Sequence, residues 1–351
     1  MGKQFLSRAS YVTYMPSEDD AISAINEVTS AALTAGVQNT ALRVSDMAAR
    51  TVVDHMSLSQ HDGSKAIHAD GVDFWAAPMY GNLFTSGMVT ADSSVRGQFG
   101  GLALGMDVES QQILGGKVRV GAALNGGGGQ STAKGNVTSV SNDYNFGGVN
   151  VYAGWNKGAF NVIGSIGYGF ADHEVDMSLP GSMQMGSAKT DIDTTTVTAE
   201  LRAEYQFKTA HVDVLPHAGI RYTSLQTDAH DLTVNGAVLN NVKSDTQNIV
   251  QFPIGVTLSK DVEACGWNVK PMLDISVIPA AGDKEANTKV NFAGLDAWDS
   301  VNTRIMDSTS WAGTIGVQAE KGDFTLGLNY GVQASSNETD QNVQLKLGWK
   351  F

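Results

Sequence analysis

The final segment of the chain, residues 342–351, alternates between apolar and polar side chains. Its apolar positions are Val343, Leu345, Leu347, Trp349 and Phe351. Its polar positions are Gln344, Lys346, Gly348 and Lys350. Because successive side chains of a strand point to opposite faces, this pattern predicts a strand with one apolar and one polar face. An aromatic residue at the end, with two lysines on the other face, favours the closing strand of a membrane barrel over a strand of a soluble protein.

The same period of two residues continues through the chain from about residue 70. It predicts twelve strands, near residues 70–84, 95–109, 116–126, 143–156, 159–175, 190–207, 210–226, 246–261, 266–280, 302–320, 323–335 and 341–351. In the sixth strand, apolar residues from Val197 to Phe207 alternate with polar residues from Thr196 to Gln206. The expected fold class is therefore all-β, a twelve-stranded antiparallel transmembrane β-barrel.

The connections between these strands alternate in length. Tight turns are expected at residues 156–158, 208–209, 263–266 and 321–323, most of which contain Gly, Asn or Asp. Long polar loops are expected at residues 126–142, 176–189, 227–245 and 281–301. Short turns on one side and long loops on the other are typical of outer-membrane barrels, which keep the turns in the periplasm. This asymmetry predicts a periplasmic C-terminus.

Composition narrows the alternatives further. No apolar run approaches the roughly 18 residues that a transmembrane helix needs, so a membrane protein of this sequence must cross with strands. Aromatic residues such as Trp155, Trp267 and Trp311 lie near predicted strand ends, as an interfacial girdle requires, whereas a soluble sandwich would bury them mid-strand. The formal net charge of −13 argues against a nucleic-acid partner. The single cysteine, Cys265, excludes an internal disulfide.

Two helical stretches precede the strands. Ser17 and the acidic residues after it predict a helix start, and apolar residues at helical spacing in 21–33 continue the first stretch up to Gly36. The second stretch, from about Asn39 to Met56, has a length on the order of 25–30 Å, close to the thickness of the hydrocarbon core of a bilayer. It is too polar to lie in lipid. It either lies in a polar lumen or packs on another element as a soluble amphipathic helix.

Charged residues also fall on the inward face of the predicted barrel. Glu200, Arg202 and Glu204 form one inward column. The other charged residues expected in the lumen are Asp107, Glu109, Lys117, Arg119 and Arg221. Because a charge in a partly dry lumen needs a partner, these side chains either pair with one another or hold the helix. The helix would contribute Arg43, Asp46, Arg50 and Asp54.

No catalytic or cofactor-binding pattern is present in the sequence. It lacks a Gly-x-Ser-x-Gly motif, a His-Glu-x-x-His motif and a phosphate-binding loop. His211 and His217 share a strand face but stand roughly 20 Å apart, too far for one metal ion. We therefore expect no cofactor, no metal site and no enzymatic activity.

The order of these features resembles the translocator domain of monomeric autotransporters, the type V secretion systems, over residues 18–351. The resemblance rests on the helical segment, the barrel of about twelve strands, the run Gly-Val-Asp-Phe-Trp at 71–75 and the final strand. The resemblance implies that an N-terminal passenger emerges at the cell surface through or alongside the barrel, while the helix stays in the lumen and blocks the pore. It also implies a bacterial outer-membrane location. The implied partners are outer-membrane lipid and lipopolysaccharide, the passenger, and the barrel-assembly machinery, which would read the final strand.

The expected domain organisation follows from these features. Residues 1–16 are a passenger remnant or an added leader, residues 17–68 a helical linker or plug, and residues 69–351 the barrel. The first residues lack the apolar core of a signal peptide, so we expect the signal in a longer parent chain, or the chain to be a truncated product. An outer-membrane porin or small diffusion channel is an alternative function, and a soluble all-β binding protein is another.

Some autotransporters cut their own passenger free inside the barrel. In one subgroup the cut follows an asparagine that cyclises with the help of acids in the lumen, and it falls between two asparagines. Asn39-Thr40 is the nearest match here and lacks the second asparagine. The resemblance therefore implies Asn39 as the candidate cleavage residue.

Overall fold

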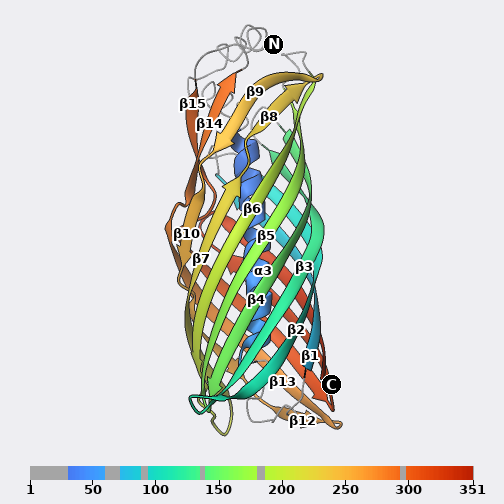
Figure 1. The fold of residues 1–351 in the computed structure, drawn as a ribbon, viewed down its shortest axis with the longest axis vertical. Helices are drawn as coiled ribbons and strands as arrows, with labels where there is room; N and C mark the ends of the chain where they lie inside the picture. Colours follow the sequence, from blue (N-terminus) through green and yellow to red (C-terminus); the bar gives the residue numbers. More distant parts are fainter. Residues whose placement is uncertain are drawn as a thin grey trace.

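The computed structural model describes residues 31–59, 72–87, 94–134, 139–179, 186–292 and 298–350. They form a closed barrel of antiparallel strands around one long helix (Figure 1). The predicted twelve-stranded barrel with a helix in its lumen is thus confirmed. The segments expected at 1–16 and 60–68, most of the first helical stretch, and Phe351 lie outside the described residues.

Eleven of the twelve barrel positions are each filled by one strand. These strands are β1 (Val72–Ser86), β2 (Ser94–Ile113), β3 (Gly116–Lys134), β4 (Ser139–Lys157), β5 (Phe160–Ser178), β6 (Ser187–Tyr205), β7 (Asp213–Thr227), β13 (Trp267–Gly282), β16 (Thr309–Lys321), β17 (Phe324–Ala334) and β18 (Glu338–Lys350). The last strand pairs with the first, with Ala76 opposite Leu347, and closes the barrel. Closure leaves no open edge, which a sheet in lipid requires.

The twelfth position, between β7 and β13, is interrupted. It is shared by β10 (Gln247–Gln251), β11 (Ile254–Ser259) and the short β12 (Val262–Ala264). The prediction of one continuous strand at 246–261 is therefore wrong. The break falls at Phe252-Pro253, because proline has no backbone N–H to donate to a neighbouring strand.

Two predicted loops form β-hairpins that extend the barrel wall at one end. The segment 227–245 contains β8 (His230–Val234) and β9 (Ala237–Ser244), joined at Asn235 and Gly236, which have φ of 49° and 76°. The segment 281–301 contains β14 (Glu285–Phe292) and the start of β15 (Asp299–Arg304). β9 pairs with β14, so the two hairpins form one extension above the barrel (Figure 1).

Other predicted boundaries were also wrong. The expected strand at 302–320 splits into β15 of the extension and β16 of the barrel. The expected loop at 126–142 consists largely of the ends of β3 and β4, and the expected loop at 176–189 includes the end of β5 and the start of β6. Polar residues dominate these segments because they stand above the apolar belt, and polarity alone does not distinguish a solvated strand from a loop.

The two ends of the barrel differ. Tight turns with positive φ, as at Leu114-Gly115 and Cys265-Gly266, gather at the end where the C-terminus lies (Figure 1). We call this the turn end. The hairpin extension and the N-terminal end of the helix lie at the opposite end, which we call the extension end.

The helix α3 (Ala31–Met56) runs along the lumen without interruption (Figure 1). The predicted break at Gly36 is therefore wrong, because a single glycine costs a helix only about 1 kcal/mol and the surrounding wall supports it. No helix among the described residues is long and apolar enough to cross a membrane.

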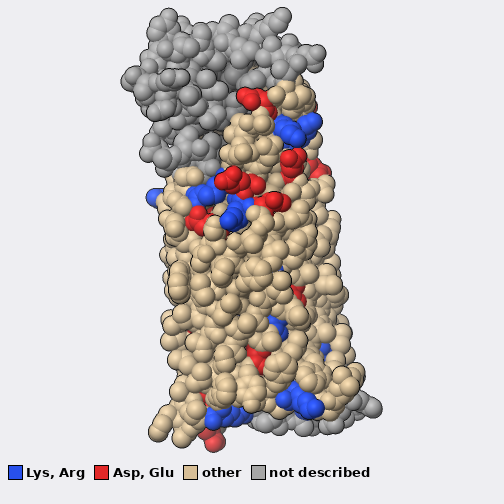
Figure 2. Space-filling model, turned by 90° about the vertical axis from the view of Figure 1, so that its left-hand side faces the viewer, with Lys and Arg blue, Asp and Glu red and all other residues tan. Residues whose placement is uncertain are grey.

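The outer surface of the barrel is apolar through its middle. Outward side chains such as Leu104, Leu124, Ile166, Leu201 and Ile315 are each more than half exposed. On the face shown in Figure 2, charged side chains gather toward the two ends and most of the middle is uncharged. This distribution is what a lipid-facing belt requires.

Candidate functional site

One side of α3 packs on the barrel wall through apolar contacts. The helix residues Val44, Met47, Val52, Val53 and Met56 form one buried cluster with wall residues of β1 to β5, including Trp75, Phe99, Phe146, Tyr152 and Ile163. A second cluster, near the N-terminal end of the helix, joins Ala41 and Leu42 to Leu225, Ile249 and Ile305. These contacts explain why a helix with many charged residues stays in the lumen.

The upper part of the helix is held by a carboxylate pair from the final strand. The Arg43 guanidinium bonds to Glu338 and lies 3.3 Å from Asp340. Asn39, one turn earlier, is fully buried and donates through Nδ2 to Glu338 Oε1 (3.0 Å) and to the carbonyl of Ile305 (2.8 Å). Its Oδ1 accepts a hydrogen bond from Thr85 (3.2 Å). The helix is thus tied to β18 and to β1, where the barrel closes.

The middle of the helix meets charged and polar groups of β6, β7 and β17. Asp46 Oδ1 lies 3.4 Å from Arg221, whose Nε donates to Glu200 at 2.7 Å. Arg50 bonds to Gln333. These contacts place helix charges opposite wall charges of the other sign, which lowers the cost of burying both.

Near the turn end, His55 joins a buried cluster on β1, β2 and β3. Its Nε2 lies 2.6 Å from Asp107 Oδ2, and its ring stacks on Trp75 with centroids 4.7 Å apart. Arg119 Nε lies 2.9 Å from Asp107, and Arg119 also pairs with Asp73.

The C-terminal end of the helix is capped by the wall. Asn161 donates to the carbonyl of Met56 (3.2 Å), and Lys270 donates to the carbonyl of Leu58 (3.0 Å). Glu204 accepts from the backbone N–H of Leu58 at 3.0 Å. A cation and amide donors at the carbonyl end of a helix satisfy groups that have no partner within it.

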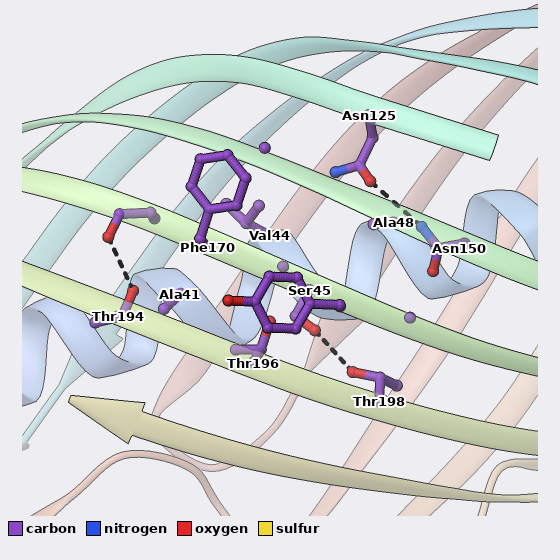
Figure 3. Close-up of a pocket in the computed structure, with 15 residues that line it drawn as sticks. Ala41, Val44, Ser45, Ala48, Asn125, Asn150, Phe170, Thr194, Thr196 and Thr198 are labelled. Atoms are coloured by element: carbon purple, nitrogen blue, oxygen red, sulfur yellow. Dashed lines mark hydrogen bonds between the residues drawn. The ribbon is translucent and has the colours of Figure 1, made fainter. Parts of the chain in front are cut away.

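Two small cavities border α3 among the described residues. One has a volume of about 30 Å³ and lies between Ser45 and Ala48 of α3 and the small residues of β4 to β6, including Asn150 and Thr198 (Figure 3). The other, of about 60 Å³, lies between Arg50 and the wall at β1, β17 and β18. Spaces of this size hold a few water molecules, so the helix lies close to the wall at both places.

The charged residues predicted from the sequence fall into two groups in the structure, those that pair between helix and wall and those that pair within the wall. The structure brings Arg43, Asp46 and Asp54 of the helix into ion pairs with the wall, where Arg221 and Arg202 are the partners of the two aspartates. It places Asp107 of the wall in a hydrogen bond with His55 of the helix. Arg202 lies 3.7 Å from Asp54 and 2.9 Å from Glu204. Glu109 instead pairs with Lys117 on the neighbouring strand, at 3.2 Å.

Sequence reasoning missed several contact residues, including Glu338, Asp340, Asp73 and Lys270. A signal for the first two was present: extending the polar face of the final strand upward from Gln344 by steps of two reaches Asp340 and Glu338. The apolar residues of that strand, Val343, Leu345, Leu347 and Trp349, point outward and are 37–51% exposed. No group of three His, Cys, Asp or Glu side chains in the described parts of the chain could hold a metal ion.

A closed β-barrel with an apolar outer belt and a helix packed in its lumen defines a class, the outer-membrane translocator domains. The family model of the autotransporter β-domain matches residues 74–331. The chain therefore belongs to the autotransporter β-domain family, and its role is that of an outer-membrane translocator.

Solved structures agree in fold. The translocator domain of the autotransporter NalP from Neisseria meningitidis is similar at a TM-score of 0.63 and 16% identity, covering 91% of this chain and 99% of that one. The β-domain of the Bordetella autotransporter BrkA is similar at a TM-score of 0.62 and 15% identity, and the match covers 80% of this chain and 100% of that one. The transport unit of the autotransporter AIDA-I from Escherichia coli is similar at a TM-score of 0.59 and 13% identity, and the match covers 85% of this chain and 97% of that one. A comparison with curated proteins gave no significant match.

Proposed function

We propose that this barrel exports a passenger attached upstream of α3, and that α3 then remains in the lumen as its plug. The continuous helix, tied to the wall by Arg43 near one end and by Leu58 at the other, carries this proposal. The N-terminal end of α3, to which the passenger would be attached, lies at the extension end (Figure 1). That end therefore faces the cell exterior, and the turn end, with the C-terminus, faces the periplasm.

The domain boundaries fit the same proposal. Residues 1–16 are a passenger remnant, residues 17–68 the helical linker and plug, and residues 69–351 the barrel. The outward apolar side chains of β18 form the surface that the barrel-assembly machinery would read during insertion. Lipopolysaccharide and other outer-membrane lipids contact the exposed belt.

Deleting residues 18–58 tests the plug and separates a translocator from a porin. We expect single-channel conductance in planar bilayers to rise about tenfold, because a helix about 10 Å across no longer fills the lumen. A variant that lacks only residues 1–16 is the control and should conduct like the full chain. An unchanged conductance after the longer deletion would favour an open diffusion channel.

A second candidate activity is self-cleavage after Asn39. Its Nδ2 would attack its own carbonyl carbon, Glu338 would take the proton from Nδ2, and the bond to Thr40 would break with the proton passing to the new amine. The 3.0 Å contact between Nδ2 and Glu338 Oε1 favours this step over hydrolysis elsewhere in the helix.

N-terminal sequencing of outer-membrane material tests the cleavage. We expect a species that starts at Thr40 from the wild type and its loss in Asn39→Gln, which cannot form the same five-membered ring. Gln38→Ala, one residue earlier, is the matched control for the position, because it creates no second asparagine. A single unprocessed species that starts upstream of Ser17 would rule the activity out.

A further inference from the structure

The outer face of the barrel has a polar hollow over β1, β2 and β3, near the extension end. It has a volume of about 620 Å³ and is lined by outward side chains that include Asn82, Phe84, Arg96, Gln98, Gln130 and Thr132. Buried residues such as Leu83 and Val95 alternate with them along the strands. The hollow therefore opens toward the surrounding membrane and not into the lumen.

Arg96, which lines this hollow, and Lys134, which lies on β3 beyond its lining, form no ion pair with the described parts of the chain. The Arg96 guanidinium lies over the Phe84 ring, 5.3 Å from its centroid, and has no ion pair. Lys134 is exposed on β3, one outward position above Thr132, which is the partner of Arg96. By contrast, the exposed Lys189 on β6 pairs with Asp176 at 2.8 Å.

Between this hollow and the middle of the barrel, the outer surface of β2 and β3 carries few side chains. Gly100 on β2 pairs with Gly128 on β3, and both face outward. Gly126 lies two residues further along β3, opposite Leu102. A side chain at Gly100 would meet nothing within 4 Å, so the three glycines form a furrow that leads from the polar hollow into the apolar belt.

The strands that follow β3 carry acidic side chains at the same end of the barrel, beginning with the exposed Asp143 on β4, which stands across from Gln130. Asp172 stands directly across from Asp193, and Glu174 across from Asp191, on the outward faces of β5 and β6. An anionic headgroup is repelled there and attracted to the hollow at β1 to β3. The distribution of charge at this end of the barrel therefore favours an anionic headgroup at the hollow over one at β5 and β6.

We propose that this hollow binds a phosphorylated glycolipid of the outer leaflet, with a phosphate held between Arg96 and Lys134 and an acyl chain along the furrow of Gly100, Gly126 and Gly128. The inference rests on the proposed orientation, in which the extension end faces the cell exterior. An arginine and a lysine without carboxylate partners match a phosphate, and the amide groups of Gln98 and Gln130 match sugar hydroxyls.

Binding of lipid A to the purified full chain in detergent, measured by native mass spectrometry, tests the proposal. We expect the double variant R96Q/K134Q to lose roughly tenfold in affinity for lipid A that carries two phosphates. The reason is that each basic residue near a membrane surface adds electrostatic attraction to an anionic headgroup. Lipid A stripped of phosphate should bind wild type and double variant equally weakly. Gly100→Leu, which fills the furrow and keeps the charges, should weaken both lipids.

Lys189→Gln is the matched control, because it removes an exposed cation whose charge is already paired, and it should bind lipid A like the wild type. Equal binding of phosphorylated lipid A by R96Q/K134Q and wild type would overturn the proposal, as would equal binding of the two lipids by wild type. A heat-dependent shift in gel mobility checks that each variant is folded. The conductance of the helix deletion reports on the translocator separately, so failure of either idea is recognised on its own.

Discussion

Arg43 shows how a single side chain connects the plug to the barrel. Its guanidinium contacts Glu338 and Asp340 on the last strand and lies 3.7 Å from Asp46 on its own helix. All of these groups are at most 16% exposed, so the loss of one leaves another charge buried without a partner. Such a loss destabilises far more than the loss of a surface pair.

Asp307 plays a comparable part outside the membrane, where it joins two loops at the extension end. It accepts hydrogen bonds from Ser335 Oγ (2.6 Å), from the backbone N–H of Asn337 (2.8 Å) and from Asn337 Nδ2 (3.0 Å), and it pairs with Arg304. Partial burial alone would raise the pKa of Asp307, but these hydrogen bonds and Arg304 lower it below its usual value. The ionised form is therefore favoured in the folded loop.

The lowered pKa of Asp307 gives the sign of a pH effect. Its stabilisation is complete above the unfolded pKa of about 3.9 and is lost as pH falls through the lower folded value. We expect hydrogen-exchange protection of the Asn337 amide, corrected for intrinsic rate, to stay constant above about pH 5 and to fall between about pH 4 and pH 2 in the wild type. In Asp307→Asn the protection should be lower by about 1–2 kcal/mol at pH 6 and should change little with pH.

Asp245→Asn is the control for that measurement. Its pair with Lys289 spans 3.6 Å between exposed side chains, so its removal should leave the protection of Asn337 unchanged. Equal pH dependence in the wild type and Asp307→Asn would show that another group controls the loop.

At the scale of elements, α3 and the wall fit because the wall has small residues where the helix approaches. Gly154 on β4 is the clearest case, since a Cβ there would lie 2.6 Å from the Met56 side chain. An inward glycine in a barrel wall can serve in two ways, by making room for a packed helix or by easing curvature. At Gly154 the contact with Met56 supports room for the helix.

Substitution of Gly154 tests this fit. We expect Gly154→Leu to displace Met56 and to destabilise the seating of the helix end by about 1–3 kcal/mol, the usual cost of overpacking. The measurement is hydrogen exchange at residues 54–58, together with a rise in bilayer conductance. Gly154→Leu combined with Met56→Ala should restore protection, because the smaller residue makes room.

Gly164→Leu on β5 is the matched control for this substitution, since a side chain there would meet its nearest neighbours only at 3.9 Å, on the lipid-facing side. It should leave both readouts unchanged. If Gly154→Leu behaves like Gly164→Leu, the glycine serves curvature and not the helix.

At the scale of the whole molecule, the barrel is a container whose wall and contents are stabilised together. α3 has many charged residues, and no lipid or soluble core would accept it as it stands. The wall supplies an apolar side for Val52 and Val53 and a charged side for Arg43 and Asp46. A plug built this way stays in place while the outer surface remains free to contact lipid.

The sequence by itself determined the barrel class and the approximate position of its strands, because a period of two and the contrast of short turns with long polar segments are local properties. It also identified the second helix and most of its charges. Only the tertiary structure decided the contacts of those charges. Asn39 and Glu338 are 299 residues apart and meet only because β18 closes on β1. The hairpins of the extension likewise depend on pairing between β9 and β14, where Val242 stands opposite Val290, and a local pattern does not reveal which distant strand a segment pairs with.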